Sequence, residues 1–572
     1  MPLTANARAV LEKRYLLKDA HGRPAESPEA LFLRVATDIA SAEAAFGNSP
    51  RPWVRRFHEM MVEGDFLPNS PTLMNAGREL QQLAACFVLP VEDSIDSIFG
   101  TLRASALIHK SGGGTGFSFS RLRPKGDRVA TSQGAASGPV SFIRVFNAAT
   151  NAINQGGFRR GANMAVLAAD HPDIEDFVRA KRDRGELSNF NVSVLVTDDF
   201  MRKAAAGDPW ALVNPRTRLV VKHIRADKLL EALIEEAHDS GEPGLLFRDR
   251  IERDNPTPGL GAIEATNPCG EQPLLPYEAC TLGSINLARF VKNTGFDLAR
   301  LEQVVADSVR FLDNVLERNR YPLPAIERLT RANRKIGLGV MGWADALVLL
   351  GVPYDSDEAV ALADRTMAAF SRAARAASQQ LARERGPFPN YPESIHARGA
   401  GYPIRNATVS TVAPTGTLSI LAGTSGGIEP LFALAFERHV MDGEVLPEAH
   451  PEFARLAREG GFDRPEIWAH VKKTGGVRGC EAVPERIRRA FATAADIAPA
   501  WHVRMQAAFQ RHVDSAVSKT VNFPKEATRA QVAAAFRAAW EAGCKGITVY
   551  RDGCRAGQAM AKGDCSGPAC VA

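Results

Sequence analysis

The feature that most constrains this chain is a proline-bounded decapeptide, ATNPCGEQPL, at residues 265–274. Its two prolines disfavour a helix and its glycine permits a tight turn, so we predict a loop tip. In an extended segment Asn267, Cys269 and Glu271 would stand at alternate positions and point in one direction. A thiol between an amide and a carboxylate suits chemistry in which a sulfur and a proton acceptor act on one small group. The alternative is a loop whose cysteine is merely a small buried hydrophobe.

The composition indicates a soluble globular protein. The 572 residues suggest three or four domains, or one large α/β barrel with additions, and 45% of them are hydrophobic. A net charge of +5 gives no reason to expect nucleic-acid binding. We find neither a signal-peptide core nor an apolar run of membrane-spanning length, so no membrane association is expected. Eight cysteines are too dilute for a secreted disulfide scaffold and fit the reducing cytoplasm.

The first third of the chain predicts helices and then a strand. Residues 1–62 read as a helical region, with Ser27 as a helix N-cap and Pro28 in the first turn. Residues 66–77 contain two prolines and end in glycine, which predicts a long ordered loop. The apolar run at residues 86–90 predicts a strand. Asp93 and Ser94 then either cap the next helix or contact a ligand ribose, and the cap is the simpler interpretation.

Three loops could bind anionic groups. The glycine-rich turn at residues 111–116 lacks the lysine of a phosphate-binding loop, but it lets backbone N–H groups approach a ligand. Residues 155–161 carry two adjacent arginines, suited to phosphate or carboxylate, or else to a solvated surface loop. A β-branched strand at residues 409–413 leads into PTGT at 414–417, which predicts either a phosphate seat or an ordinary helix start.

We reject two apparent motif matches. Residues 337–342 fit G-x-G-x-x-G, but the segment before them is too polar for a buried parallel strand. We predict a turn there, before a helix over 343–350. Residues 236–241 nearly match a cobalt-ligating histidine pattern, but they end an amphipathic helix that stops at Gly241.

The C-terminal segment predicts a last strand at residues 546–551 and then a tail without an apolar face. The tail carries Cys565 and Cys570, and two thiols on such a tail suit a disulfide shuttle. No metal site is expected, although Cys544 and Cys554 prevent complete exclusion of zinc or of a part in thiol exchange.

Three motifs occur in the order of a known family: NPCGEQ at 267–272, CTLGSIN at 280–286 and PTGT at 414–417. The chain resembles the catalytic chain of a ribonucleotide reductase, specifically the adenosylcobalamin-dependent class II type, over nearly its whole length. The resemblance implies a ten-stranded α/β barrel with a central finger loop that carries Cys269. It also implies three regions: a helical N-terminal region at 1–80, the barrel at 81–551 and a flexible redox-active tail at 552–572.

The resemblance implies roles for five catalytic residues. Cys269 would carry the thiyl radical that removes the ribose 3′-hydrogen, Glu271 would be the general base, and Asn267 would hydrogen-bond the ribose hydroxyls. Cys86 and Cys280 would supply two electrons and become a disulfide as the 2′-hydroxyl leaves as water. They are 194 residues apart, so only the fold could bring them together.

The resemblance also implies binding sites and partners. Cys565 and Cys570 would reduce the active-site disulfide and be recharged by thioredoxin or glutaredoxin. The substrate, expected to be a ribonucleoside diphosphate although a triphosphate is not distinguished, would contact Ser70, Ala85, Cys86, Gly114, Asn267, Pro414, Thr415, Gly416, Thr417 and Leu418. A deoxynucleoside triphosphate effector would contact Asp93, Ser94, Arg123, Gln155 and Arg159. A homodimer is expected, with the effector site at its interface.

The class assignment rests on absences. Class I chains relay a radical through two adjacent tyrosines in the last strand, and here Val549 precedes Tyr550. No glycyl-radical motif appears, so adenosylcobalamin is inferred by elimination and likeness. No N-terminal extension for on/off regulation by ATP and dATP is expected. Two alternatives remain: a class I catalytic subunit that needs a radical-generating partner, and a non-catalytic nucleotide-binding regulator.

Overall fold

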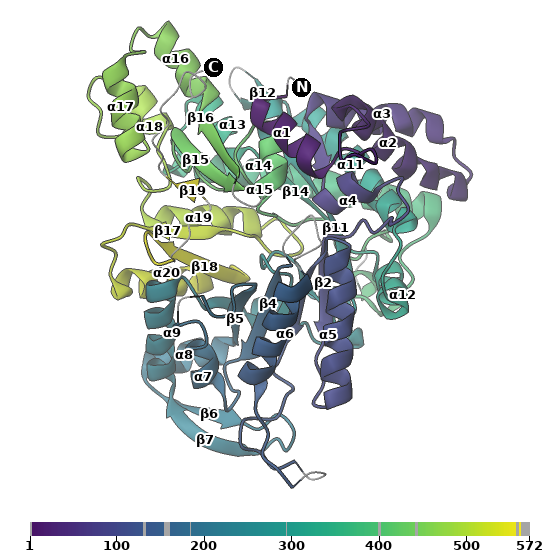
Figure 1. The fold of residues 1–572 in the computed structure, drawn as a ribbon, viewed down its shortest axis with the longest axis vertical. Coiled ribbons are helices and arrows are strands. Elements are labelled where there is room, and N and C mark those ends of the chain that lie inside the picture. The colour runs from purple at the N-terminus through teal and green to yellow at the C-terminus, as the bar shows by residue number, and fades with distance from the viewer. Residues whose placement is uncertain are drawn as a thin grey trace.

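The computed structural model places a ten-stranded mixed sheet at the centre, with helices on its outside (Figure 1). It describes residues 3–129, 133–153, 161–183, 185–292, 295–398, 402–440, 444–555 and 560–561. The chain begins with the helices α1 (Ala5–Arg14), α2 (Pro28–Ala40) and α3 (Pro50–Glu63) and the 3₁₀ turn Ser41–Phe46. This confirms the predicted helical start, and the side chain of Ser27 accepts from Ala30 N as the predicted N-cap of α2.

Five neighbouring strands of the sheet run parallel, and further strands pair antiparallel with each end of this group. Five neighbours run parallel: β2 (Cys86–Pro90), β3 (Gly114–Ser118), β4 (Asn163–Ala168), β5 (Phe190–Val196) and β8 (Gly244–Phe247). At one side β2 pairs antiparallel with β11 (Ala279–Asn286), which also pairs with β1 (Phe66–Pro68) and with β14 (Ile336–Met341). At the other side β8 pairs antiparallel with β18 (Gly546–Arg551), beside β17 (Thr520–Phe523).

Single bridges extend the sheet between these two sides. Leu338 of β14 bridges to Ser410, and Val412 bridges to Val517, three residues before β17. The β-branched segment at 409–413 therefore contributes isolated bridges and is not one of the assigned strands. A closed barrel remains a prediction.

Helices alternate with the strands and cover the sheet. The connections carry the following helices: α5 (Ile95–Lys110), α6 (Pro139–Ile153), α7 (Ile174–Val178), α8 (Asp198–Ala206), α9 (Ala226–Ser240), α10 (Arg248–Arg253), α11 (Leu298–Arg318), α12 (Pro324–Asn333), α13 (Trp343–Leu350), α14 (Asp357–Arg385), α15 (Gly416–Ala422), α19 (Pro499–Gln510) and α20 (Arg529–Glu541). The hairpin of β6 (Pro209–Val213) and β7 (Val220–Arg225) projects at one end of the molecule, beyond α7 and α8 (Figure 1).

A second lobe lies at the opposite end (Figure 1). It contains α16 (Pro451–Glu459), α17 (Pro465–Thr474), α18 (Glu485–Ala490) and a small sheet of β15 (Ala435–Val440) and β16 (Glu444–Ala449). The short strand β19 (Met560–Ala561) pairs with β15, so this part of the tail adopts structure that the sequence did not predict. Among the described residues, no helix combines the length and apolar character needed to cross a bilayer.

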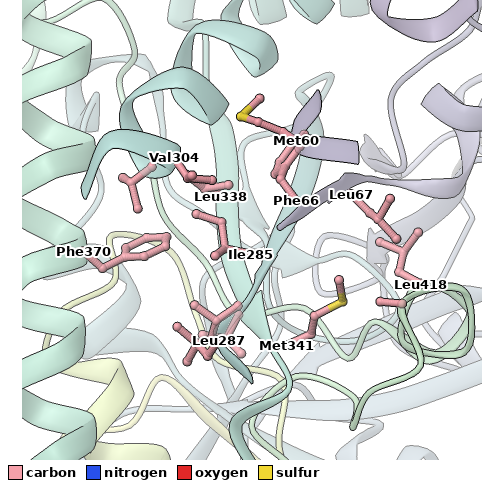
Figure 2. Close-up of a cluster of buried hydrophobic side chains, with 14 of the residues drawn as sticks. Met60, Phe66, Leu67, Ile285, Leu287, Val304, Leu338, Met341, Phe370 and Leu418 are labelled. Carbon is pink, nitrogen blue, oxygen red and sulfur yellow. The ribbon is translucent and has the colours of Figure 1, made fainter. Parts of the chain in front are cut away.

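One apolar core joins the N-terminal helices to the sheet. Met60 of α3, Phe66 of β1, Ile285 of β11 and Leu338 of β14 pack together with side chains of α11 and α14 (Figure 2). Leu418 of α15 belongs to the same cluster, so the predicted phosphate turn stands on the main core of the protein.

Two local predictions are wrong. Residues 66–77, predicted as one loop, form β1 and the short helix α4 (Ser70–Asn75), because Asn69 caps the helix and a proline fits its first turn. Residues 337–342, predicted as a turn, lie mostly in the buried parallel strand β14. The predicted helix after it is α13, and Gly342 is its positive-φ N-cap.

Candidate active site

The decapeptide at 265–274 forms a hairpin that packs against β3 and β4 of the main sheet. Strands β9 (Ala265–Thr266) and β10 (Pro273–Leu274) pair antiparallel, and Gly270 N donates to Asn267 O at 3.1 Å with Gly270 at a φ of 81°. Cys269 is exposed at the tip, as the predicted loop tip requires. Asn267 and Glu271 are buried. All three side chains nevertheless act on Cys86: Asn267 donates a hydrogen bond to its sulfur, and, in addition to burial, Glu271 and Cys269 both raise its pKa, in line with the expected common direction.

Two glycines of β3 let this hairpin approach the sheet. A Cβ atom on Gly116 would lie 1.7 Å from the backbone oxygen of Thr266, and one on Gly114 would lie 2.9 Å from the ring of Pro268. Asn191 Nδ2 of β5 donates to Pro268 O at 2.8 Å. Close contact with β3 and the hydrogen bond from β5 therefore fix the position of the hairpin relative to the sheet.

Further hydrogen bonds hold the side chain of Asn267 and the backbone of Glu271 in place. Asn267 Oδ1 accepts from Gln272 N at 2.9 Å, and Asn267 Nδ2 donates to Cys86 Sγ at 3.0 Å. The carbonyl oxygen of Glu271 accepts from Thr411 Oγ1 at 2.8 Å and from Ala516 N at 2.9 Å. The backbone on both sides of Cys269 is thus anchored to separate parts of the sheet.

Cys86 and Cys280 are direct cross-strand partners. They face each other in the antiparallel pair of β2 and β11, and both are free and buried. Burial raises the pKa of both thiols, and the nearby Glu271 carboxylate raises the pKa of Cys86 further. Both sulfurs therefore remain protonated near neutral pH, as thiols that donate hydrogen must.

The neighbours of these thiols include two more expected substrate contacts. Gly114 lies beside Cys86 in the parallel pair of β2 and β3, and Ala85 N donates to Cys280 O at 3.2 Å. Ser70 begins α4, and its hydroxyl lies 2.7 Å from the hydroxyl of Tyr15.

The predicted phosphate turn begins α15. Thr415 has a positive φ of 52°, and its hydroxyl accepts from Gly427 N at 2.8 Å. A Cβ atom on Gly426 would lie 2.8 Å from Pro414 O, so the loop at 425–430 packs tightly over the turn. The N–H groups of Gly416, Thr417 and Leu418 stand in the first turn of the helix, where no intrahelical acceptor exists.

The described effector candidates meet at one end of α5. Arg123 Nε donates to Asp93 Oδ2 at 2.8 Å, and Ser94 is the N-cap of α5, with its hydroxyl accepting from Ser97 N at 3.1 Å. Gln155, Arg159 and the tail cysteines Cys565 and Cys570 lie outside the described residues. Cys544 and Cys554 are buried, and no group of three or more potential metal-ligating side chains occurs in the described part of the chain.

Sequence reasoning missed several residues around the site. Thr411 holds the backbone of Glu271, Tyr15 contacts Ser70, and Lys335 forms a buried ion pair with Glu278 beside Cys280. The spacing of Glu278 and Cys280, two residues apart, could have indicated that their side chains lie on the same face of an extended segment. The other contacts join segments far apart in sequence, which no local pattern reveals.

Comparisons with known proteins agree on one family. The chain matches the family models described as "Ribonucleotide reductase, barrel domain" over residues 84–550 and "Ribonucleotide reductase, all-alpha domain" over residues 1–81. A vitamin B12-dependent ribonucleoside-diphosphate reductase of Mycobacterium tuberculosis (strain CDC 1551 / Oshkosh) is 54% identical over 562 residues, covering 98% of this chain and 81% of that protein. A protein of the same description from Thermoplasma acidophilum is 46% identical over 623 residues, with the same coverages of 98% and 81%. The solved alpha subunit of the Actinobacillus ureae class Id ribonucleotide reductase shares the fold, with a TM-score of 0.78 and 23% identity, covering 96% of this chain and 97% of that chain.

Proposed function

The chain belongs to the ribonucleotide reductase family, and we propose that it reduces ribonucleoside diphosphates to 2′-deoxyribonucleoside diphosphates with adenosylcobalamin. The vitamin B12-dependent relatives at 54% and 46% identity support this class over a class I subunit. The observation that carries the catalytic proposal is the pairing of Cys86 with Cys280 beside the hairpin that bears Cys269. A nucleotide-binding regulator would need neither this dithiol nor the exposed thiol.

Access to Cys269 fits the cofactor. Cys269 is exposed at the hairpin tip, whereas its two polar neighbours are buried. A large group can therefore meet this sulfur from outside, and Cys269 is the residue that would face it. The chemistry that adenosylcobalamin supplies when bound is generation of a thiyl radical at this position.

Each of the chain's own site residues then has a separate chemical role. Cys269 removes the 3′-hydrogen of the ribose, Glu271 accepts the proton of the 3′-hydroxyl, and Asn267 hydrogen-bonds the ribose hydroxyls. Cys86 and Cys280 supply two electrons and two protons, so the 2′-hydroxyl leaves as water and the thiols become a disulfide. Cys269 recovers its hydrogen at the end of the cycle.

We propose that the binding residues expected from the resemblance hold the substrate. The turn at 414–418, whose backbone N–H groups start α15, would bind the phosphates. Ser70, Ala85 and Gly114 would contact the nucleotide near the two thiols. The three proposed regions of the chain are residues 1–80, 81–551 and 552–572.

A second copy of the chain would complete the effector site. Ile95, Phe99 and Leu107 are exposed on α5, and Val145 is exposed on the adjacent α6. Exposed apolar side chains that recur along one helix next to a second helix favour a protein interface. Ser94 caps this same helix, and Asp93 and Arg123 pair there, so an effector at that end of α5 would sit close to the interface.

The test is turnover by the purified single chain. We expect deoxyribonucleotide from a ribonucleoside diphosphate with dithiothreitol and adenosylcobalamin. Activity that required an added metal-containing protein would favour the class I alternative.

Replacing Cys565 and Cys570 with serine should abolish turnover with thioredoxin while dithiothreitol still supports it. Equal loss with both reductants would contradict a shuttle role for the tail.

A further inference from the structure

A buried ion pair lies beside one of the two cross-strand thiols. Lys335 Nζ donates to Glu278 Oε2 at 2.6 Å, and the two side chains are only 2% and 1% exposed. Glu278 Oε2 also accepts from Leu275 N at 2.7 Å, and its Oε1 accepts from Asn333 Nδ2 at 2.5 Å. A buried pair of this kind adds little stability compared with apolar side chains of equal volume. Its position therefore suggests another function.

Three observations place this pair against Cys280. Glu278 precedes Cys280 by two residues, so their side chains share one face of the extended chain. The parallel register of Thr281 with Ile336 sets Lys335 beside Cys280. Cys280 Sγ also lies 3.7 Å from the carbonyl oxygen of Lys335. Burial raises the pKa of the Cys280 thiol, the Lys335 ammonium lowers it, and the Glu278 and Glu271 carboxylates raise it by smaller amounts.

The partner thiol differs from Cys280 in its neighbouring charges and in its access. Cys86 faces the Glu271 carboxylate, which together with burial raises the pKa of this thiol. Cys86 is also the more accessible of the two, with 4% of its surface exposed against none for Cys280. The Glu271 carboxylate therefore acts on both sulfurs, and the fully buried Cys280 has the Lys335 ammonium beside it as well.

Given the proposed function, in which these thiols form a disulfide, we infer that Lys335 is a positioning residue that fixes the direction of disulfide reduction. A thiolate of the dithiol reductant attacks Cys86 Sγ and forms a mixed disulfide. The bond between Cys86 and Cys280 breaks, and Cys280 leaves with the electron pair as a thiolate beside the Lys335 ammonium. The second thiolate of the reductant then attacks the mixed disulfide and releases Cys86. The reductant becomes a disulfide, and two protons return to the two protein sulfurs.

The size of the effect follows from the charge. An opposite charge at close range shifts a pKa by about 1–3 units, and a thiol of lower pKa leaves faster from a disulfide. Taking a dependence on the leaving thiol of about the same size as that known for the attacking thiol, about half of such a shift enters the rate, and loss of the ammonium should slow this step by about tenfold. It should also abolish the preference for attack at Cys86.

The first test locates the attack. The oxidised full chain with Cys565 and Cys570 replaced by serine is treated with 2-mercaptoethanol, quenched with acid, and its adducts are mapped by mass spectrometry. A monothiol stays on the sulfur that it attacks, so we expect the adduct mainly on Cys86. An adduct mainly on Cys280, or equal amounts on both, would overturn the inference.

The second test changes the charge in this same tail variant. Lys335→Met should slow disulfide reduction by dithiothreitol about tenfold and lose the preference for Cys86, while Lys335→Arg should retain both. Because Lys335→Met leaves a buried carboxylate, Lys335→Met combined with Glu278→Gln serves if the single variant does not fold. The combined variant should also lose the preference for Cys86. Wild-type rates and preference in a folded, charge-free variant would refute a role for Lys335.

These tests are independent of nucleotide chemistry. Thiol exchange is measured without substrate or cofactor, whereas the proposed function is measured by single-turnover product formation from the reduced wild-type chain. Failure of product formation refutes the proposed function whatever Lys335 does. Product formation with unchanged thiol exchange in the Lys335 variants refutes only this inference.

Discussion

The change Gly116→Ala tests the position of the catalytic hairpin directly. A Cβ atom on Gly116 would lie 1.7 Å from Thr266 O, and real Cβ atoms essentially never approach a backbone atom closer than 3.0 Å. Strand β3 and the hairpin must therefore separate by about 1.3 Å at this point. A displacement of about 1 Å at a reacting group can cost on the order of 10²-fold in rate. We expect kcat to fall about a hundredfold, because Cys269 and Glu271 move with the hairpin.

The measurement is single-turnover deoxyribonucleotide formation beside nucleotide affinity and thermal unfolding. Affinity should change less than rate, because the phosphate turn belongs to α15. Overpacking costs about 1–3 kcal/mol, so Tm should fall by a few degrees without loss of the fold. Gly479→Ala is the matched control, since a Cβ atom there meets nothing within 4 Å and Tm and rate should not change. A Gly116→Ala rate within threefold of wild type would refute this account of the site.

Three further predictions concern the radical, the pH dependence and the assembly. Cys269→Ser should abolish single-turnover reduction, because an O–H bond is too strong for this chemistry. Glu271→Gln should leave a rate about 10²- to 10⁴-fold lower than that of the wild type. Product formation by Cys269→Ser would refute the radical role. Burial alone would raise the pKa of Asp345, but the ion pair with His450 and the hydrogen bond from Ser425 N lower it to about 2. The carboxylate therefore adds stability above its unfolded pKa of about 3.8, and this gain is lost as the pH falls toward 2. Asp345→Asn should remove that pH dependence, and a wild-type acid profile in urea titrations would contradict it. Phe99→Glu should convert the proposed dimer to a monomer in sedimentation, and an unchanged mass would exclude this face.

Local patterns predicted the elements that depend on local chemistry. The strands at 86–90 and 546–551 and the helix at 343–350 have the bounds that the sequence indicated. Each is a short apolar run that ends at a proline, a glycine or a charged residue, so its boundaries are set by its own residues. The hairpin tip was predicted for the same reason, because prolines and a glycine exclude the helical alternative.

The glycines of β14 show why other elements could not be predicted. Residues 337–342 contain three glycines and read as a turn, yet Gly337 and Gly339 lie in a buried strand. A Cβ atom on Gly339 would lie 2.4 Å from Thr411 O, and one on Gly337 would lie 2.5 Å from Leu282 Cδ2. These glycines are required by the close passage of two segments, one 55 and the other 72 residues away in sequence, which local propensity does not contain.

The pairing of the reductive thiols was reached by family resemblance and not by pattern. Cys86 and Cys280 become neighbours only through the register of β2 and β11, and a slip of one residue would point the two side chains to opposite faces. The Lys335–Glu278 pair depends likewise on the register of β11 with β14. Strand register therefore determines both the position of the dithiol and the charge beside it.

In the proposed mechanism, burial of the dithiol would create a need for a separate electron carrier. Depth in the sheet raises the pKa of Cys86 and Cys280 and keeps both sulfurs protonated for hydrogen donation. The same depth leaves at most 4% of either residue exposed, so the surface of a folded protein reductant cannot reach the disulfide. Only a small dithiol, or a narrow chain segment that carries its own thiols, can enter. In the proposed mechanism, the environment that suits the thiols to substrate reduction thus prevents their direct recharging, and the proposed role of the two tail cysteines would meet that requirement.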